Sequence, residues 1–299
     1  MEEKIENQIE NIFDLNSKSI HLTFEIIEKN ELCKGPIDFK SYSNLETLVI
    51  DGYKNYQERI KIDIINLDLV EKLNKIKIYD VVIKRMNLSP NVKELIFINS
   101  LIIELDYFDK LPNGLKKLVC PSMNINKLDN LPIELEYLDC SENELIHLDY
   151  LPAGLKYLNC SNNKIIKLDD LPNQLVYLDC SHNTITQLDS LPDSLEEVYA
   201  KSNQIIFVKR LPSNLKKANF INNPLVSKPN CQLSTLLLNY SLDYEKSSIT
   251  DNIAQIGYKT IYNTYYGLKY ITYGTGISLI GIGLLAVSPV IYGLNKIKN

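Results

Sequence analysis

A Leu-Pro pair recurs every 20 residues through the middle of the chain, and this spacing constrains the fold more than any other feature of the sequence. The pairs begin at Leu111, Leu131, Leu151, Leu171, Leu191 and Leu211. Each unit follows the pattern LPxxLxxLxCSxNxIxxLDx with small changes. One such unit is too short to bury its own apolar side chains, so successive units must stack and share a core. The sequence therefore predicts one solenoid, not the two globular domains that a length of 299 residues suggests.

The residues of one unit predict its local structure. Leu158 and Cys160 are two residues apart, which is the period of a strand, so each coil contributes a short strand to a parallel sheet on the concave face. Pro152 fixes φ and donates no hydrogen bond, so the return segment is expected to be extended or a short 3-10 turn. An asparagine amide both donates and accepts, and can satisfy backbone groups at the corner of each coil. The asparagines at this position form a predicted ladder: Asn143, Asn163, Asn183, Asn203 and Asn223. Met123 replaces the amide in the first regular coil, which predicts a local irregularity.

Four cysteines repeat with the same spacing at an inward position of the strand. They are Cys120, Cys140, Cys160 and Cys180, and Ala200 follows them. Neighbouring strands lie about 4.8 Å apart with parallel Cβ vectors, which suits a disulfide poorly. The acidic N-terminus lacks the apolar run of a secretory signal, which favours a reducing compartment. We therefore expect a structural core of free thiols, with disulfides or metal thiolates as the alternative.

This repeat resembles that of leucine-rich repeat proteins. More narrowly, it is similar to the short LPX type of bacterial secreted effectors and of repeat proteins from A/T-rich giant viruses of amoebae. Regular copies cover residues 111–226, and degenerate copies extend the solenoid back through 45–110. We expect residues 1–44 to be an N-terminal cap, with a helix around Ile9 and a strand from Ile20 to Ile26; an F-box-like interaction module is the alternative. Residues 227–268 are expected to form a C-terminal cap or an amphipathic linker.

The charge-free segment 270–295 carries the one membrane signal. A helix over 271–294 would be about 36 Å long, enough to cross a hydrocarbon core of about 30 Å. Tyrosines flank both ends, and its glycines are common in membrane helices. We therefore predict a single transmembrane helix within 269–296 that acts as a C-terminal tail anchor, with the repeats facing the cytosol. A buried C-terminal hairpin is the alternative.

Composition and motifs argue against an enzyme. The chain has three histidines and lacks P-loop, GxSxG, HExxH and CxxC motifs, so we expect no catalytic residues, cofactor or metal site. A net charge of −5 argues against nucleic acid, and no small-molecule substrate is expected. Aspartates recur on the return side, where we expect them to form turns, with calcium binding as a weaker alternative. These are Asp129, Asp149, Asp169 and Asp189.

The outward strand positions are the remaining candidate site, and they form three stripes. The candidate partner-binding residues are Tyr137, Tyr157 and Tyr177; Asp139, Asn159 and Asp179; Ser141, Ser161 and Ser181; and Tyr199. Tyrosine is a common anchor of protein interfaces, although tyrosines on a sheet also pack on one another. We predict a non-enzymatic scaffold that binds a protein through this face. The alternatives are an adaptor for ubiquitin transfer that uses residues 1–44, and a structural virion or membrane component.

Overall fold

The computed structural model describes residues 9–10, 12–52, 59–103, 107–206, 208–225, 270–272 and 278–280. The chain divides into two compact units. The first comprises residues 1–223 and 230–241, and the second comprises residues 224–229 and 242–299. Each unit is described by itself.

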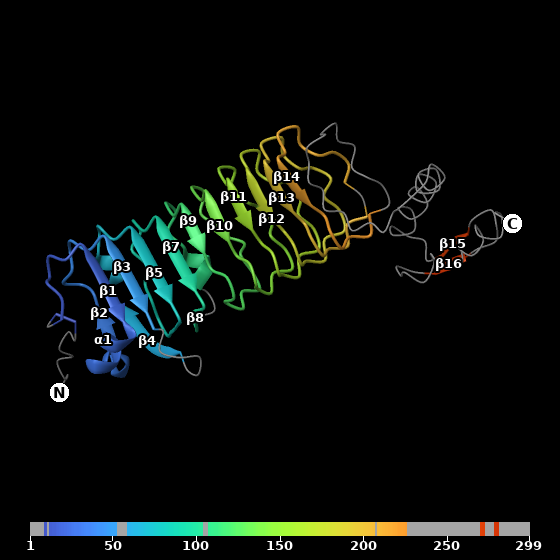
Figure 1. Cartoon of the computed structure of the whole chain (residues 1–299). Coiled ribbons are helices and arrows are strands. Elements are labelled where there is room, and N and C mark those ends of the chain that lie inside the picture. The colour runs from blue at the N-terminus through green and yellow to red at the C-terminus, as the bar shows by residue number, and fades with distance from the viewer. Residues whose placement is uncertain are drawn as a thin grey trace. The chain divides into compact units, whose positions relative to one another are not determined.

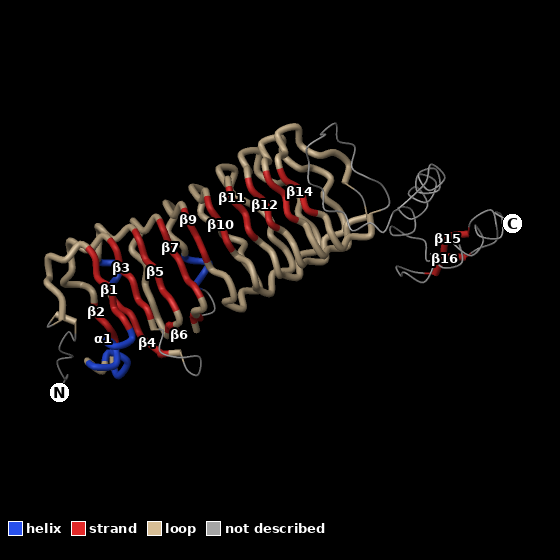
Figure 2. Tube along the Cα trace, viewed as in Figure 1, coloured by secondary structure: helices blue, strands red, loops and turns tan. Residues whose placement is uncertain are grey.

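The first unit is a solenoid built on one long parallel sheet (Figures 1 and 2). Its ten strands follow the chain order β1-β3-β5-β7-β9-β10-β11-β12-β13-β14. They are β1 (Ser19–Thr23), β3 (Thr47–Asp51), β5 (Lys75–Tyr79), β7 (Glu94–Ile98), β9 (Lys117–Val119), β10 (Tyr137–Asp139), β11 (Tyr157–Asn159), β12 (Tyr177–Asp179), β13 (Glu197–Tyr199) and β14 (Lys217–Asn219). Equivalent residues of successive repeats pair directly, as Tyr137 does with Tyr157. The predicted solenoid with a parallel sheet is confirmed.

A second parallel sheet, which the sequence did not reveal, covers the return side of the first coils. It contains β2 (Pro36–Asp38), β4 (Ile60–Ile65), β6 (Val81–Ile83) and β8 (Leu101–Ile102). The first two coils are 28 residues long, since Ser19 pairs with Thr47 and Thr47 with Lys75, whereas the coil that holds β6 spans only 19 residues from Lys75 to Glu94. The returns of the 20-residue coils are tied instead by isolated backbone hydrogen bonds, such as Lys164 N–H to the Leu145 carbonyl at 2.9 Å. The described returns also hold two short 3-10 helices, η2 (Leu67–Leu69) and η3 (Tyr107–Lys110).

The sheet begins inside the segment that the sequence assigned to a cap. Strand β1 pairs with β3 over its whole length, so Ser19–Thr23 is part of the main sheet. The strand expected to reach Ile26 ends at Thr23, because the chain then enters α1 (Phe24–Lys29), which buries Ile27; the 3-10 helix η1 (Leu32–Lys34) follows. Ile9 lies in a turn where a helix was expected. It is buried, and its carbonyl accepts a hydrogen bond of 2.8 Å from the Tyr42 hydroxyl.

Alternation along each short strand places the apolar side chains in a shared core. In β11, Leu158 is fully buried between the half-buried Tyr157 and Asn159, as period 2 requires. Leu155, Cys160 and Ile165 of the same coil are also fully buried. Their counterparts in the coils on either side are buried as well, so the core runs continuously through the stack.

The ladder asparagines tie each coil to the one before it. The Asn183 side-chain oxygen accepts a hydrogen bond of 2.9 Å from the Ile165 N–H of the preceding coil. Its amide nitrogen donates to the carbonyls of Cys160 and Cys180, both at 3.0 Å. Asn143, Asn163, Asn203 and Asn223 make the same set of contacts. The amide therefore satisfies backbone groups that the corner leaves unpaired.

The coil that carries Met123 is locally irregular, as the missing amide predicts. Asn124 adopts φ of 58°, whereas its counterparts Glu144 and Lys164 are not among the residues of positive φ. The Asn143 side-chain oxygen accepts hydrogen bonds from both Met123 N–H, at 3.0 Å, and Ile125 N–H, at 2.9 Å. The bond from Met123 N–H is additional to the set of contacts that the other ladder asparagines make.

The cysteine ladder lies directly behind the sheet. Cys120, Cys140, Cys160 and Cys180 are free thiols with fully buried side chains. Each cysteine N–H continues the sheet toward the next coil, as Cys140 does to the Asn159 carbonyl at 2.9 Å. Burial, followed by the neighbouring cysteines, raises the pKa of the Cys160 thiol well above its ordinary value. These thiols are therefore poor nucleophiles inside an apolar core.

The second unit contains two antiparallel strands, β15 (Tyr270–Thr272) and β16 (Ser278–Ile280), with Ile271 opposite Leu279. The continuous helix predicted over 271–294 is therefore wrong at these residues. β-branched residues and glycines, in which this segment is rich, are poor helix formers. No helix within the described ranges has the length and apolar character needed to cross a membrane. The rest of the predicted span, and residues 227–268, lie outside the described residues.

Candidate protein-binding face

A column of stacked tyrosines runs along the outer face of the main sheet. The rings of Tyr137 and Tyr157 lie 4.0 Å apart between centroids, with 2° between their planes. Tyr157 and Tyr177 lie 4.4 Å apart, with 5° between their planes. The cause is register: each ring projects from the same position of parallel strands that are in register. The rings share their faces with one another and present their edges and hydroxyls outward.

Different groups close the two ends of this column. Lys117, one strand before Tyr137, holds its Nζ 4.1 Å from the centre of the Tyr137 ring. At the other end, Tyr177 pairs with Glu197, so the next aromatic residue is Tyr199, which lies opposite Asp179. The Tyr199 ring is tilted by 42° to that of Tyr177, at 5.6 Å. The aromatic surface therefore continues at Tyr199, which occupies the position of the second stripe and not that of the first.

The column tyrosines keep their protons at any physiological pH. Burial raises the pKa of Tyr157 to about 12. Burial, followed by the charge of Asp179, raises the pKa of Tyr177 to about 12. A protonated hydroxyl both donates and accepts a hydrogen bond. The face thus offers a partner a row of neutral hydroxyls next to apolar ring edges.

The second stripe, Asp139, Asn159 and Asp179, is half-buried and fixed by the turn that follows each strand. Asp139 Oδ1 accepts hydrogen bonds from Ser141 N–H, at 3.1 Å, and from Ser141 Oγ, at 2.7 Å. Asn159 Oδ1 accepts the same two bonds from Ser161, at 3.1 and 2.8 Å. Asp179 Oδ1 accepts from Ser181 N–H at 2.9 Å. These contacts hold the stripe in a set orientation beside the tyrosines.

The third predicted stripe is wrong as a binding surface. Ser141, Ser161 and Ser181 are 7–8% exposed. Each strand ends two residues before the serine, so the serine lies in the corner of the coil. There its N–H donates a hydrogen bond to the side-chain oxygen of the Asp or Asn that ends the strand. The serines orient the second stripe and do not face a partner.

Ion pairs border the tyrosine column. The Glu197 carboxylate lies 2.8 Å from Lys217 Nζ and also accepts a hydrogen bond of 2.9 Å from the Tyr199 hydroxyl. Glu136 lies between Lys156, at 2.6 Å, and Lys116, at 3.6 Å. The lysine partners lower the pKa of both glutamates. The candidate residues predicted from the sequence do not include Glu136, Lys116 or Lys117, although adding the 20-residue spacing to each strand would have found them.

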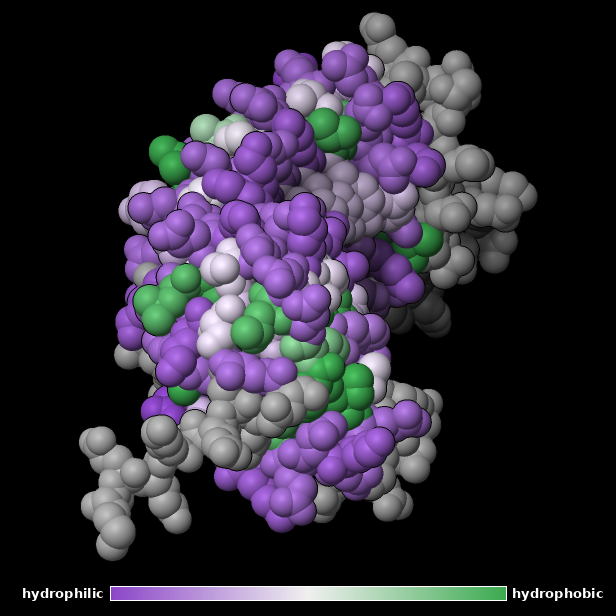
Figure 3. Space-filling view, turned by 90° about the vertical axis from the view of Figure 1, so that its left-hand side faces the viewer, coloured by the Kyte–Doolittle hydropathy of each residue, from purple (hydrophilic) through white to green (hydrophobic). Residues whose placement is uncertain are grey.

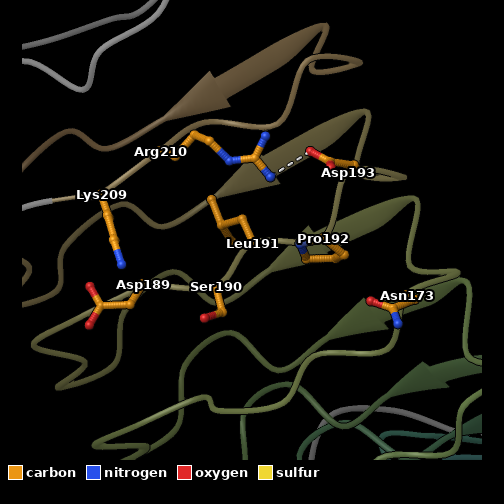
Figure 4. A pocket seen from close by; sticks show the side chains of 8 residues that line it. All are labelled: Asn173, Asp189, Ser190, Leu191, Pro192, Asp193, Lys209 and Arg210. Carbon is orange, nitrogen blue, oxygen red and sulfur yellow. Dashed lines mark ion pairs between the residues drawn. The ribbon is translucent and has the colours of Figure 1, made fainter.

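Other features of the described surface do not form a competing site. Asn173, Asp189–Asp193, Lys209 and Arg210 line a shallow pocket of about 370 Å³, where Arg210 and Asp193 form an ion pair at 2.8 Å (Figure 4). The residues that the structure describes contain no cluster of three His, Cys, Asp or Glu side chains able to hold a metal. Seen from the N-terminal end, the described surface is largely hydrophilic, with scattered apolar residues (Figure 3).

Comparison with known proteins agrees with this geometry. Residues 153–193 match the model for leucine-rich repeats in two copies. The match, together with the stacked coils and the parallel sheet, shows that this chain contains leucine-rich repeats and has the solenoid fold of that class of protein. Comparison with curated protein sequences gave no match.

Three solved structures of bacterial proteins are similar to this chain. YopM from Yersinia enterocolitica is 27% identical, with a TM-score of 0.50, over 66% of this chain and 48% of that one. The InlJ functional domain from Listeria monocytogenes, which includes a cysteine ladder, is 27% identical with a TM-score of 0.53, over 64% of this chain and 42% of that one. YopM from Yersinia pestis shares the fold. It is 24% identical, with a TM-score of 0.52, over 70% of this chain and 67% of that one. This chain spans less than half of the first two structures.

Proposed function

We propose that this protein is a non-enzymatic scaffold that binds a partner protein through the outer face of strands β10–β13. The observation that carries the proposal is the continuous tyrosine column from Tyr137 to Tyr177, extended by Tyr199. Tyrosine supplies a large contact area with few rotatable bonds and a polar tip, which is why it is enriched at interface hot spots. Solenoids of this class present extended surfaces that suit such binding.

Preorganisation supports the same proposal. The rings are held by stacking, and the stripe beside them is held by the serine contacts, so little side-chain freedom remains to be lost on binding. Ordering each flexible side chain at an interface costs about 0.5–1.5 kcal/mol, so a surface that is already ordered binds more tightly for the same area.

A pull-down with matched variants tests the binding face. The triple change of Tyr137, Tyr157 and Tyr177 to Ala should abolish capture of the partners that the wild type retains. Tyr150 is 90% exposed and lies outside the column, so Tyr150→Ala serves as the control and should leave capture intact. Circular dichroism checks that the triple variant is folded. Unchanged capture by a folded triple variant would contradict the proposal.

We also propose that the C-terminal segment attaches the protein to a membrane. The support is the sequence: residues 270–295 contain no charged side chain and are flanked by lysines. The form that the segment takes in a membrane is left open, since Tyr270–Thr272 and Ser278–Ile280 are strands. Alkaline carbonate extraction of the expressed protein tests it. Retention in the membrane pellet is expected, and release by carbonate would contradict the proposal.

Two finer assignments stay predictions. We infer the short LPX subtype from the Leu-Pro pairs at a spacing of 20, whereas the resemblance to repeat proteins of giant viruses is an expectation from the sequence. The adaptor alternative gains no support, since Ser19–Thr23 and Pro36–Asp38 of segment 1–44 are strands of the two sheets. A structural role in a virion or membrane likewise has no specific observation in its favour.

A further inference from the structure

Some charged side chains on the binding face form ion pairs and others do not. Several lysines and glutamates on the main sheet pair with one another, as Glu197 does with Lys217 and Glu94 with Lys75, whereas Lys117 lies over the Tyr137 ring. Asp139 and Asp179 differ: no lysine or arginine forms an ion pair with either carboxylate within the described part of the chain. Their Oδ1 atoms are engaged by serines, which cannot neutralise the charge. The face therefore carries two uncompensated negative charges next to neutral hydroxyls.

Register sets the spacing of these two carboxylates. Asp139 and Asp179 occupy the same position of strands β10 and β12, with Asn159 of β11 between them. Two steps of about 4.8 Å separate equivalent atoms by about 10 Å. Residues three apart in a polyproline II helix lie on the same face and about 9 Å apart, because this helix has three residues per turn and rises about 3.1 Å per residue. A polyproline II segment that runs along the stack can thus place side chains i and i+3 over both carboxylates.

We infer that the partner contributes a polyproline II segment with arginines three residues apart. This inference rests on the proposed binding face and names the chemistry of its ligand. A guanidinium donates several hydrogen bonds in a rigid fork and pairs with a carboxylate more specifically than an ammonium does. Tyr137 and Tyr177 lie two residues before the aspartates on the same strands, so their hydroxyls can accept the remaining donors. Because those hydroxyls stay neutral, the cation is selected by the aspartates.

The chain itself supplies a variant that removes the charge and keeps the fold. Asn159 occupies the aspartate position in β11 and accepts the same two serine bonds as Asp139. Asp139→Asn with Asp179→Asn should therefore leave the corners intact. Asp149→Asn with Asp189→Asn is the matched control, because it removes two charges at the same separation in sequence from the exposed return side.

The test measures binding of a fluorescein-labelled peptide with arginine at every third position to the full chain by fluorescence anisotropy. We expect D139N/D179N to weaken binding about tenfold at low salt, and Asn159→Asp to strengthen it. Added salt should reduce the difference by screening. The control pair should change affinity by less than about twofold, and a peptide with glutamates in place of arginines should not bind. Equal binding by D139N/D179N and wild type, or an equal loss in the control pair, would overturn the inference.

The two proposals fail in different ways. If Tyr157→Ala abolishes partner capture while D139N/D179N retains both capture and peptide binding, the face binds a partner whose chemistry is not basic. If neither set of changes affects capture or peptide binding, both the face and the basic segment are wrong.

Discussion

The rings of Tyr137 and Tyr157 stack almost face to face, with their centroids 4.0 Å apart and 2° between their planes. This separation is smaller than the roughly 4.8 Å between neighbouring strands, so the side chains lean toward each other after leaving the backbone. The stack is at once a contact between coils and a part of the outer face. The same residues therefore contribute to stability and, in our proposal, to binding.

Removal of the central ring should destabilise the solenoid. Tyr157 stacks on both Tyr137 and Tyr177, and each aromatic pair contributes about 0.5–1.5 kcal/mol beyond the area it buries. Tyr157→Ala should lower the free energy of unfolding by about 1–3 kcal/mol in urea titrations. Tyr157→Phe keeps the ring and should cost less. Equal stability of the alanine variant and the wild type would show that the stack contributes nothing.

Stability should fall at alkaline pH through the column. The pKa of Tyr157 rises on folding from 10.0 to about 12, so the folded state holds the proton more tightly than the unfolded state does. This contribution is complete below pH 10 and is lost as the pH rises from 10.0 to about 12. Urea midpoints measured across this range should decline less when Tyr137, Tyr157 and Tyr177 are all changed to Phe. An identical decline in the triple variant would argue against this origin.

The asparagine ladder should be among the costliest polar sites to remove. Asn183→Ala leaves the Ile165 N–H and the Cys160 and Cys180 carbonyls without their buried partner. Loss of such a network is expected to cost about 3 kcal/mol. Asn223 makes equivalent bonds but is half-buried, so water can replace part of its contacts, and Asn223→Ala should cost less. Thermal melts of the two variants check the order, and a reversed order would contradict it.

The cysteine ladder should be chemically inert in the folded protein. Burial raises the pKa of the Cys120 and Cys160 thiols and shields them from reagents. Iodoacetamide followed by peptide mass spectrometry should leave Cys120, Cys140, Cys160 and Cys180 unlabelled under native conditions. The same four should be labelled fully in urea. Native labelling at the rate of the unfolded chain would show that the core opens readily.

Sequence reasoning worked where a residue's role depends on its place in the repeat. Spacing alone located strands β9–β14, the asparagine contacts and the buried thiols, because a strict repeat forces equivalent residues into equivalent environments. It failed for Ser161, which alternation placed outside; the strand stops at Asn159, and a hydrogen bond back to that residue buries the serine. Alternation continues only as long as the strand does.

In the first coils, sequence reasoning located the strands of the main sheet but not how the return segments pair. The units before residue 111 carry the core residues of three strands of the main sheet, which the sequence located. The sequence did not show that β2, β4, β6 and β8 pair into a second sheet, since that pairing depends on how successive returns lie against one another. Nor did it show that Ser19–Thr23 joins the main sheet, because Ser17 stands where the later coils carry an apolar residue three positions before the first buried side chain of the strand.

The sequence by itself determined that the chain is a stack of coils, because a 20-residue unit cannot bury its own leucines. It also determined which residues share a stripe, since one register runs through the regular repeats. Only the tertiary structure decided which stripes a partner can reach and which charges are already paired. Those properties depend on where each strand ends and on which side chains meet across coils, and both are set by packing in three dimensions.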